Sequence, residues 1–157
     1  MPVFILLHVL AMFTAVALAY GPAALMVIAT RSRDVRSLRA ISATNERLGP
    51  FVGIFFGLGI VLGFVAVFTN SFDPLQGWLV IAYVLVIASL LMTFLFTSPW
   101  LRRVSQAAEA SPDEAMSPEL DALLNSSRNQ LLLIFDALLI VLLIADMVLK
   151  PLPGKLL

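Results

Sequence analysis

The stretch LLLIFDALLIVLLIADMVL, residues 131–149, decides the fold, because its 19 residues are apolar except for Asp136 and Asp146. A helix of about 20 mainly apolar residues is long enough to cross a lipid bilayer. Three more stretches meet this requirement, at residues 3–30, 50–69 and 77–98. The sequence therefore predicts an all-α integral membrane protein, an up-down four-helix transmembrane bundle that forms a single domain over residues 1–157.

The composition excludes several classes of function. The chain is 61% hydrophobic and 13% charged, whereas a soluble domain has roughly 45–50% apolar and about 25% charged residues. The net charge is zero, so no basic field indicates nucleic-acid binding. There is no cysteine for a disulfide or a thiolate metal site, and no nucleophile motif or nucleotide-binding glycine loop. The lipid bilayer is the one partner that the composition requires.

Basic residues are distributed unequally between the two sides of the predicted bundle. Lys150 and Lys155 follow span four, whereas eight arginines lie between spans one and two or between spans three and four: Arg31, Arg33, Arg36, Arg39, Arg47, Arg102, Arg103 and Arg128. Lysine and arginine favour cytoplasmic loops. Both termini are therefore predicted to lie outside the cytoplasm, with residues 102–129 as a polar cytoplasmic connection.

The two basic connections also carry local helix signals. An apolar residue at every third position from Val35 to Ile41 predicts a helical cytoplasmic extension over residues 31–48. Ser111 and Ser117 each precede a proline and acidic residues, which is the pattern of a helix N-terminus. A helix is therefore expected to start at each serine.

Glycines in span two form two faces of the predicted helix. Gly49, Gly53 and Gly57 are four residues apart, as are Gly59 and Gly63, and the step from Gly57 to Gly59 turns the helix by about 200°. One face allows a helix of the same chain to approach closely, and the other could admit a second copy or a flat ligand. Close helix packing is the default interpretation, and a homodimer through span two remains open.

His8 is the only histidine in the chain and shares a helix face with Met12. Imidazole nitrogen and thioether sulfur both bind haem iron or copper, so these two residues are candidate cofactor ligands. The alternative is a histidine that is hydrogen-bonded to a neighbouring group of the protein, which the presence of a single histidine favours.

Asp136 and Asp146 are costly at membrane depth, and such groups mark a pathway, a ligand or a structural tie. Asp146 lies roughly 5 Å from the outer end of span four, where His8 and Lys150 compete as partners. Asp136 lies deeper, and three polar residues could reach it: Asn129 on the same face, Thr93 in span three and Tyr20 in span one. It could relay protons, bind a ligand, or tie helices together as a neutral acid.

The order of several features resembles a bacterial family of predicted four-helix integral membrane proteins defined by a domain of unknown function. The resemblance covers roughly residues 4–103 and rests on His8-Val9-Leu10-Ala11, the arginine-rich first connection, Arg47-Leu48, Trp78 and Pro99-Trp100-Leu101-Arg102-Arg103. That family is distantly similar to copper-resistance membrane domains and to membrane protoporphyrinogen oxidases. The resemblance implies a bacterial plasma (inner) membrane and a haem or metal ligand at His8. Spans two and three contain no histidine or lysine, unlike the later helices of the oxidases.

Three functional hypotheses follow. The first is a non-enzymatic membrane protein that binds a ligand or supports assembly through Gly53, Gly57, Gly59 and Gly63. The second is a haem- or copper-binding redox protein that uses His8. The third is a small proton-coupled carrier in which Asp136 titrates. The first is preferred, because no catalytic motif is present.

Overall fold

The computed structural model describes residues 2–151 and 154, and within them every regular element is a helix. Four helical stretches are long and apolar enough to cross a membrane: Val3–Arg31, Val35–Thr69, Gly77–Ala110 and Ser127–Leu149. The predicted all-α class with four spans is therefore confirmed. Large apolar side chains cover the outside of the helices; Phe13 is 71% and Val148 74% exposed. Such surfaces belong to helices surrounded by lipid.

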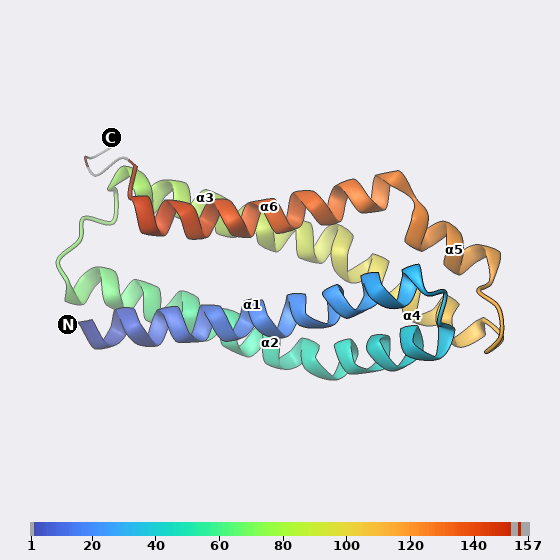
Figure 1. The fold of residues 1–157 in the computed structure, drawn as a ribbon. Coiled ribbons are helices and arrows are strands. Elements are labelled where there is room, and N and C mark those ends of the chain that lie inside the picture. Colours follow the sequence, from blue (N-terminus) through green and yellow to red (C-terminus); the bar gives the residue numbers. More distant parts are fainter. Residues whose placement is uncertain (1, 152–153, 155–157) are drawn as a thin grey trace. The chain divides into compact units, whose positions relative to one another are not determined.

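The contacts divide the chain into two compact units. Unit 1 comprises Met1–Phe72 and Ser105–Leu120, and unit 2 comprises Asp73–Val104 and Asp121–Leu157. Unit 1 is built on α1 (Pro2–Arg31) and α2 (Val35–Thr69), which run antiparallel, as Figure 1 shows.

The helix α2 begins well before the predicted span two. The Asp34 side chain caps it by accepting hydrogen bonds from the backbone N–H of Ser37 at 3.1 Å and from its hydroxyl at 2.6 Å. Val35 and Leu38 are buried in the first turns. The predicted helical extension is thus confirmed from Val35 onward, and the helix continues through Pro50.

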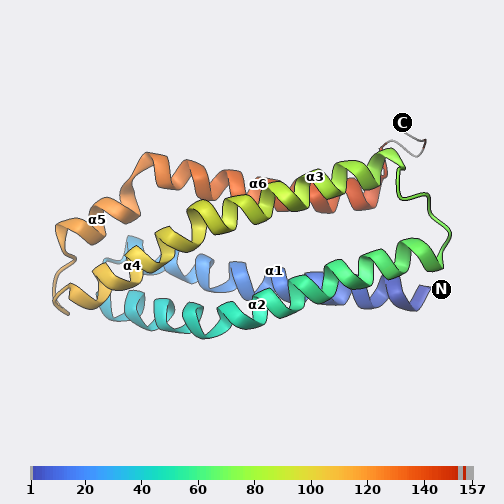
Figure 2. The same ribbon diagram turned by 180° about the vertical axis from the view of Figure 1, so that it is seen from behind.

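Unit 2 is built on a second antiparallel pair of helices, formed by residues 77–92 and 127–149, which Figure 2 shows from behind. At one end of the pair the Lys150 ammonium lies 4.9 Å from the centre of the Trp78 ring, and at the other Trp100 donates to the Leu123 carbonyl. The pair consists of α3 (Gly77–Met92) and α6 (Ser127–Leu149). They are linked by the π-helix η1 (Thr93–Thr97), by α4 (Ser98–Ala110), which runs into unit 1, and by α5 (Pro118–Asn125).

The helix of span three changes its winding just before Pro99. Ser98 donates its backbone N–H to Thr93, five residues back, so η1 is one wide turn. A proline inside a helix lacks an N–H donor and clashes with the preceding turn. A π-turn at this point lets the helix continue to Ala110, well beyond the predicted end of span three, and such turns are frequent at functional sites.

The two predicted helix starts in the polar connection have opposite outcomes. Ser117 caps α5, since its hydroxyl accepts the Leu120 N–H at 3.2 Å, so this prediction is confirmed. The predicted start at Ser111 is wrong. Its N–H and hydroxyl both donate to the Ala107 carbonyl, so Ser111 ends α4 instead.

Candidate functional site

His8 is bonded to the backbone of α2. Its Nδ1 lies 2.7 Å from the Gly59 carbonyl oxygen. A carbonyl oxygen only accepts hydrogen bonds, so Nδ1 carries a proton and donates it, which leaves Nε2 as the second ring nitrogen. The histidine is therefore a link between two helices of unit 1, with one ring nitrogen available for another partner.

Met12 fills the notch that Gly59 leaves in α2. A Cβ atom on Gly59 would lie 2.9 Å from Met12 Cγ and would also meet the Met12 sulfur. A Cβ atom on Gly63 would lie 3.0 Å from His8 Nδ1. Gly59 and Gly63 therefore permit the close approach of α1, and His8 and Met12 are the side chains that occupy the space.

This geometry does not fit a haem or copper site that uses both His8 and Met12. The Met12 sulfur is turned into the Gly59 notch, so only His8 Nε2 is free to bind a metal. Among the described residues, no three histidine or acidic side chains gather as a metal site. A cofactor bound through His8 stays a prediction, to be checked by the absorption spectrum and metal content of the purified protein and of His8→Ala.

Gly53 and Gly57 lie on the other glycine face. Both are exposed, and a Cβ atom added at either position would have no neighbour within 4 Å. Gly49 has the same open surroundings. These three glycines form an open stripe on α2, against which no described residue of the chain packs.

Both aspartates of α6 lie on its buried face. Asp136, Leu139, Leu143 and Asp146 are all buried and follow one another at spacings of three and four residues. The two carboxyl groups are ten positions apart, roughly 15 Å along the helix axis. Two leucines separate them, so this face offers no continuous polar path from Asp146 to Asp136.

The carboxyl group of Asp146 is buried without a hydrogen-bond partner in the described part of the chain. The residue is 6% exposed. Lys150, one turn further along, places its ammonium over the Trp78 ring, so it does not bond the carboxyl as considered from the sequence. A buried polar group without a partner costs about 1–3 kcal/mol. Among the described residues, nothing offsets this cost for Asp146.

Replacing Asp146 with leucine is expected to stabilise the protein by about 1–2 kcal/mol, because leucine has a similar volume and removes the unpartnered carboxyl group. Thermal unfolding of the detergent-purified protein measures the change. Leu143→Ala, on the same buried face, serves as the control and should destabilise by about 2–4 kcal/mol. Destabilisation by Asp146→Leu would mean that the carboxyl group has a partner outside the described chain.

Of the polar residues predicted around Asp136, Asn129 is bonded elsewhere. Asp136 is 8% exposed and takes part in a polar interaction. Thr93 is exposed at the start of η1, and Asn129 donates its side-chain N–H to the Leu123 carbonyl at 2.9 Å. Tyr20 belongs to α1 in unit 1 and also has an interaction partner. Asn129 is thus part of a different site, described next.

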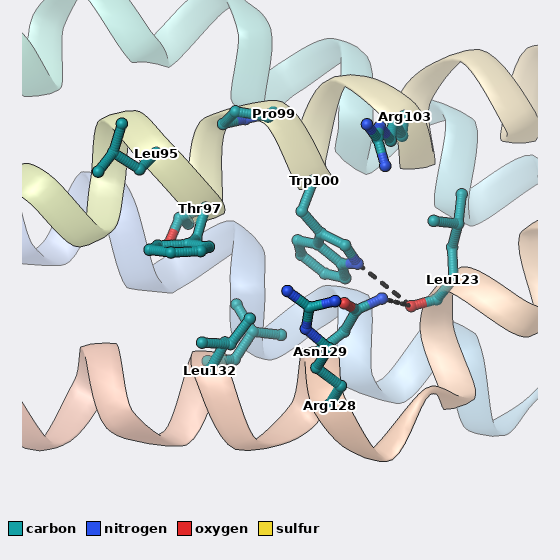
Figure 3. Close-up of a pocket in the computed structure, with 11 residues that line it drawn as sticks. Leu95, Thr97, Pro99, Trp100, Arg103, Leu123, Arg128, Asn129 and Leu132 are labelled. Atoms are coloured by element: carbon teal, nitrogen blue, oxygen red, sulfur yellow. Dashed lines mark hydrogen bonds between the residues drawn. The ribbon is translucent and has the colours of Figure 1, made fainter.

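A pocket of about 280 Å³ opens in unit 2 beside the π-helix (Figure 3). Its polar side is formed by Trp100, Arg103, Arg128 and Asn129, and its apolar side by Leu95, Phe96, Pro99, Leu132 and Leu133. Trp100 and Asn129 both donate to the Leu123 carbonyl, at 3.2 and 2.9 Å. These two bonds tie α4 and α6 to the end of α5, which fixes the shape of the pocket.

The charge in this pocket is uncompensated. No acidic residue lines it, and within residues 2–151 and 154 the side chains of Arg103 and Arg128 form no ion pair or hydrogen bond. Arg128 also stands in the first turn of α6, whose Ser126 side chain makes no capping bond. A helix N-terminus carries a partial positive charge, so three positive features converge on one cavity.

Sequence reasoning assigned Arg103 and Arg128 only to the orientation signal and did not identify this pocket. The two arginines are 25 positions apart, and no short motif connects them. The sequence did contain a signal for this pocket. Pro99, Trp100 and Arg103 follow one predicted span, and Arg128 and Asn129 precede the next, so both groups are expected at the same membrane surface.

Comparisons of the chain with protein-family models, with curated proteins and with solved structures gave no match.

Proposed function

We propose that the protein is a non-enzymatic integral membrane protein that binds an amphiphilic ligand in the pocket between Trp100 and Leu132. The observation that carries the proposal is a cavity lined by apolar residues and by two arginines, with no acidic residue among the lining. Ligand sites are concave and mostly apolar, with a few polar groups that orient the ligand. This lining suits a molecule with a polar head and an apolar tail.

The size of the cavity supports the same assignment. A volume of about 280 Å³ is enough for a head group but not for a whole lipid. The neighbouring surface is apolar and open, since Leu95 is 61% and Phe96 39% exposed. In the proposed complex the head occupies the cavity and the tail lies along this surface.

The proposed location is the cytoplasmic interface of a bacterial plasma membrane. The asymmetry of eight arginines against two lysines supports a cytoplasmic position for this end of α6. Tryptophan is enriched at membrane interfaces, which agrees with Trp100 in the pocket wall. The bacterial assignment rests on the family resemblance alone.

Filling the pocket with a bulky side chain is expected to abolish binding. In the variant Leu132→Trp the indole occupies the cavity, so native mass spectrometry of the protein purified in mild detergent should show a bound amphiphile on the wild type and none on this variant. The matched control is Leu142→Trp, on the 45% exposed surface of the same helix, and it should keep the ligand. Equal retention by all three proteins would contradict the proposal.

An assembly role is the second candidate, and the open stripe of Gly49, Gly53 and Gly57 supports it. Small residues at four-residue intervals let two membrane helices approach closely, and among the described residues no atom lies within 4 Å of a Cβ atom built on any of these three glycines of α2. The proposed partner is a second copy of the chain, which would form a homodimer through α2.

A further inference from the structure

The pocket in unit 2 selects its ligand by charge. This step rests on the proposed ligand-binding function and concerns the chemistry of the head group. Two guanidinium groups, of Arg103 and Arg128, border a cavity that no acidic residue lines. Guanidinium groups bind phosphate with paired, parallel hydrogen bonds, and they remain charged at any pH of interest.

We propose that Arg103 and Arg128 hold the phosphate of an anionic phospholipid, a lipid whose head group carries a net negative charge. The two arginines come from different helices, α4 and α6. Figure 3 shows the Arg128 side chain beside Trp100 and Asn129, with Arg103 following Trp100 along α4. A phosphate that bridges the two helices would place its negative charge between the two guanidinium groups.

The start of α6 adds a third source of attraction for an anion. The helix has 23 residues, and its Ser126 side chain leaves the first-turn N–H groups without a side-chain cap. Free N–H groups and the helix dipole make such an end favourable for phosphate. Arg128 lies in that same turn, so the dipole and the side-chain charge act at one place.

The same wall disfavours a zwitterionic lipid. The ammonium group of phosphatidylcholine would meet two guanidinium groups and no carboxylate among the lining residues. The apolar residues Leu132 and Leu133 then distinguish a lipid from free phosphate, since phosphate gains nothing from an apolar wall.

The test compares phosphatidylglycerol and phosphatidylcholine of equal, short acyl-chain length, with dissociation constants measured by native mass spectrometry. The wild type should bind phosphatidylglycerol roughly tenfold more tightly, as expected for a hydrogen-bonded charge pair. Arg103→Gln and Arg128→Gln should each reduce this preference by weakening phosphatidylglycerol binding more than phosphatidylcholine binding, since both lipids offer a phosphate but only phosphatidylcholine carries an opposing ammonium group. Arg102→Gln is the matched control, because Arg102 is exposed and does not line the pocket.

A second measurement needs no variant. The preference of the wild type for phosphatidylglycerol should shrink as salt is raised from about 0.1 to 1 M, because the Debye length falls from about 10 to 3 Å. Retention of the full preference at high salt would contradict the role of the arginines.

The outcomes separate this inference from the proposed function. Equal affinity for both lipids, with binding lost in Leu132→Trp, overturns the charge selectivity and keeps the ligand site. No binding of either lipid overturns both. Displacement of phosphatidylglycerol by inorganic phosphate at equal concentration would make free phosphate the ligand and overturn the lipid.

Discussion

Replacing Gly59 with leucine is expected to destabilise the protein by about 3 kcal/mol. The new side chain would enter the space that Met12 occupies and would compete with the hydrogen bond from His8 to the Gly59 carbonyl. Met12 can move in part because it is flexible, but α1 lies too close to α2 for both side chains to fit. Thermal unfolding of the detergent-purified protein, followed by circular dichroism, measures the loss.

The matched control for this prediction is Gly57→Leu, because Gly57 lies on the other glycine face of the same helix. A Cβ atom at Gly57 would meet no described atom within 4 Å, and leucine favours the helix over glycine by up to about 1 kcal/mol. Equal destabilisation by both variants would contradict the assigned roles of the two faces. Light scattering of Gly57→Leu tests the proposed homodimer separately. If two copies pack through α2, this variant should shift the protein from dimer to monomer.

Replacing Arg39 with alanine is expected to release the segment 105–120 from α2. Its guanidinium donates to the Ala108 carbonyl at 2.8 Å and also bonds the Ser111 carbonyl and Asp113. The two carbonyls stand at the end of α4, where no helical N–H remains for them. The loss of these bonds should lower the local free energy of opening by about 2 kcal/mol.

Hydrogen exchange measures this opening directly. A change of about 2 kcal/mol accelerates exchange of the amides in 105–120 roughly 30-fold. Arg39→Lys should be almost as disruptive, because an ammonium cannot reach all three acceptors at once. Arg36→Ala is the control, since Arg36 is exposed and its side chain bonds only Asp113 among the described residues, at 3.1 Å. Unchanged protection in Arg39→Ala would contradict the clamp.

The ion pairs of this segment also predict a pH dependence. The hydrogen bond from Arg39 lowers the pKa of Asp113 below its ordinary value of 3.8, with a further contribution from Arg36. A carboxyl group whose pKa is lowered by folding stabilises the folded state above the ordinary pKa and loses that contribution as the pH falls through the folded value. Protection of 105–120 should therefore be constant at neutral pH and decline only below about pH 4.

The sequence predicted the class of the molecule because the signal is local. Each span is a run of apolar residues whose backbone must satisfy its own hydrogen bonds in lipid, and that requirement alone makes it a helix. The start of α5 at Ser117 was predictable for the same reason, since a serine cap acts within one turn. The identical pattern at Ser111 failed because α4 already held that residue through the Ala107 carbonyl.

The site was less predictable, because its parts are distant in sequence. Composition identified Asp136, Asp146 and His8 as costly groups, and spacing identified two glycine faces. Neither could show that His8 bonds Gly59, that Met12 fills the notch, or that Asp146 lacks a hydrogen bond within the described residues. These facts depend on which residues of two helices lie opposite each other.

The sequence by itself determined a membrane protein with four apolar helices, and it determined where the basic charge lies along the chain. Only the tertiary structure decided which glycine face packs within the chain and that Arg103 and Arg128 border one cavity. The physical reason is the range of the forces involved. The free energy of transferring a helix into lipid is a sum of contributions from its own residues. A pocket depends instead on the register between helices, which the packing of individual side chains determines.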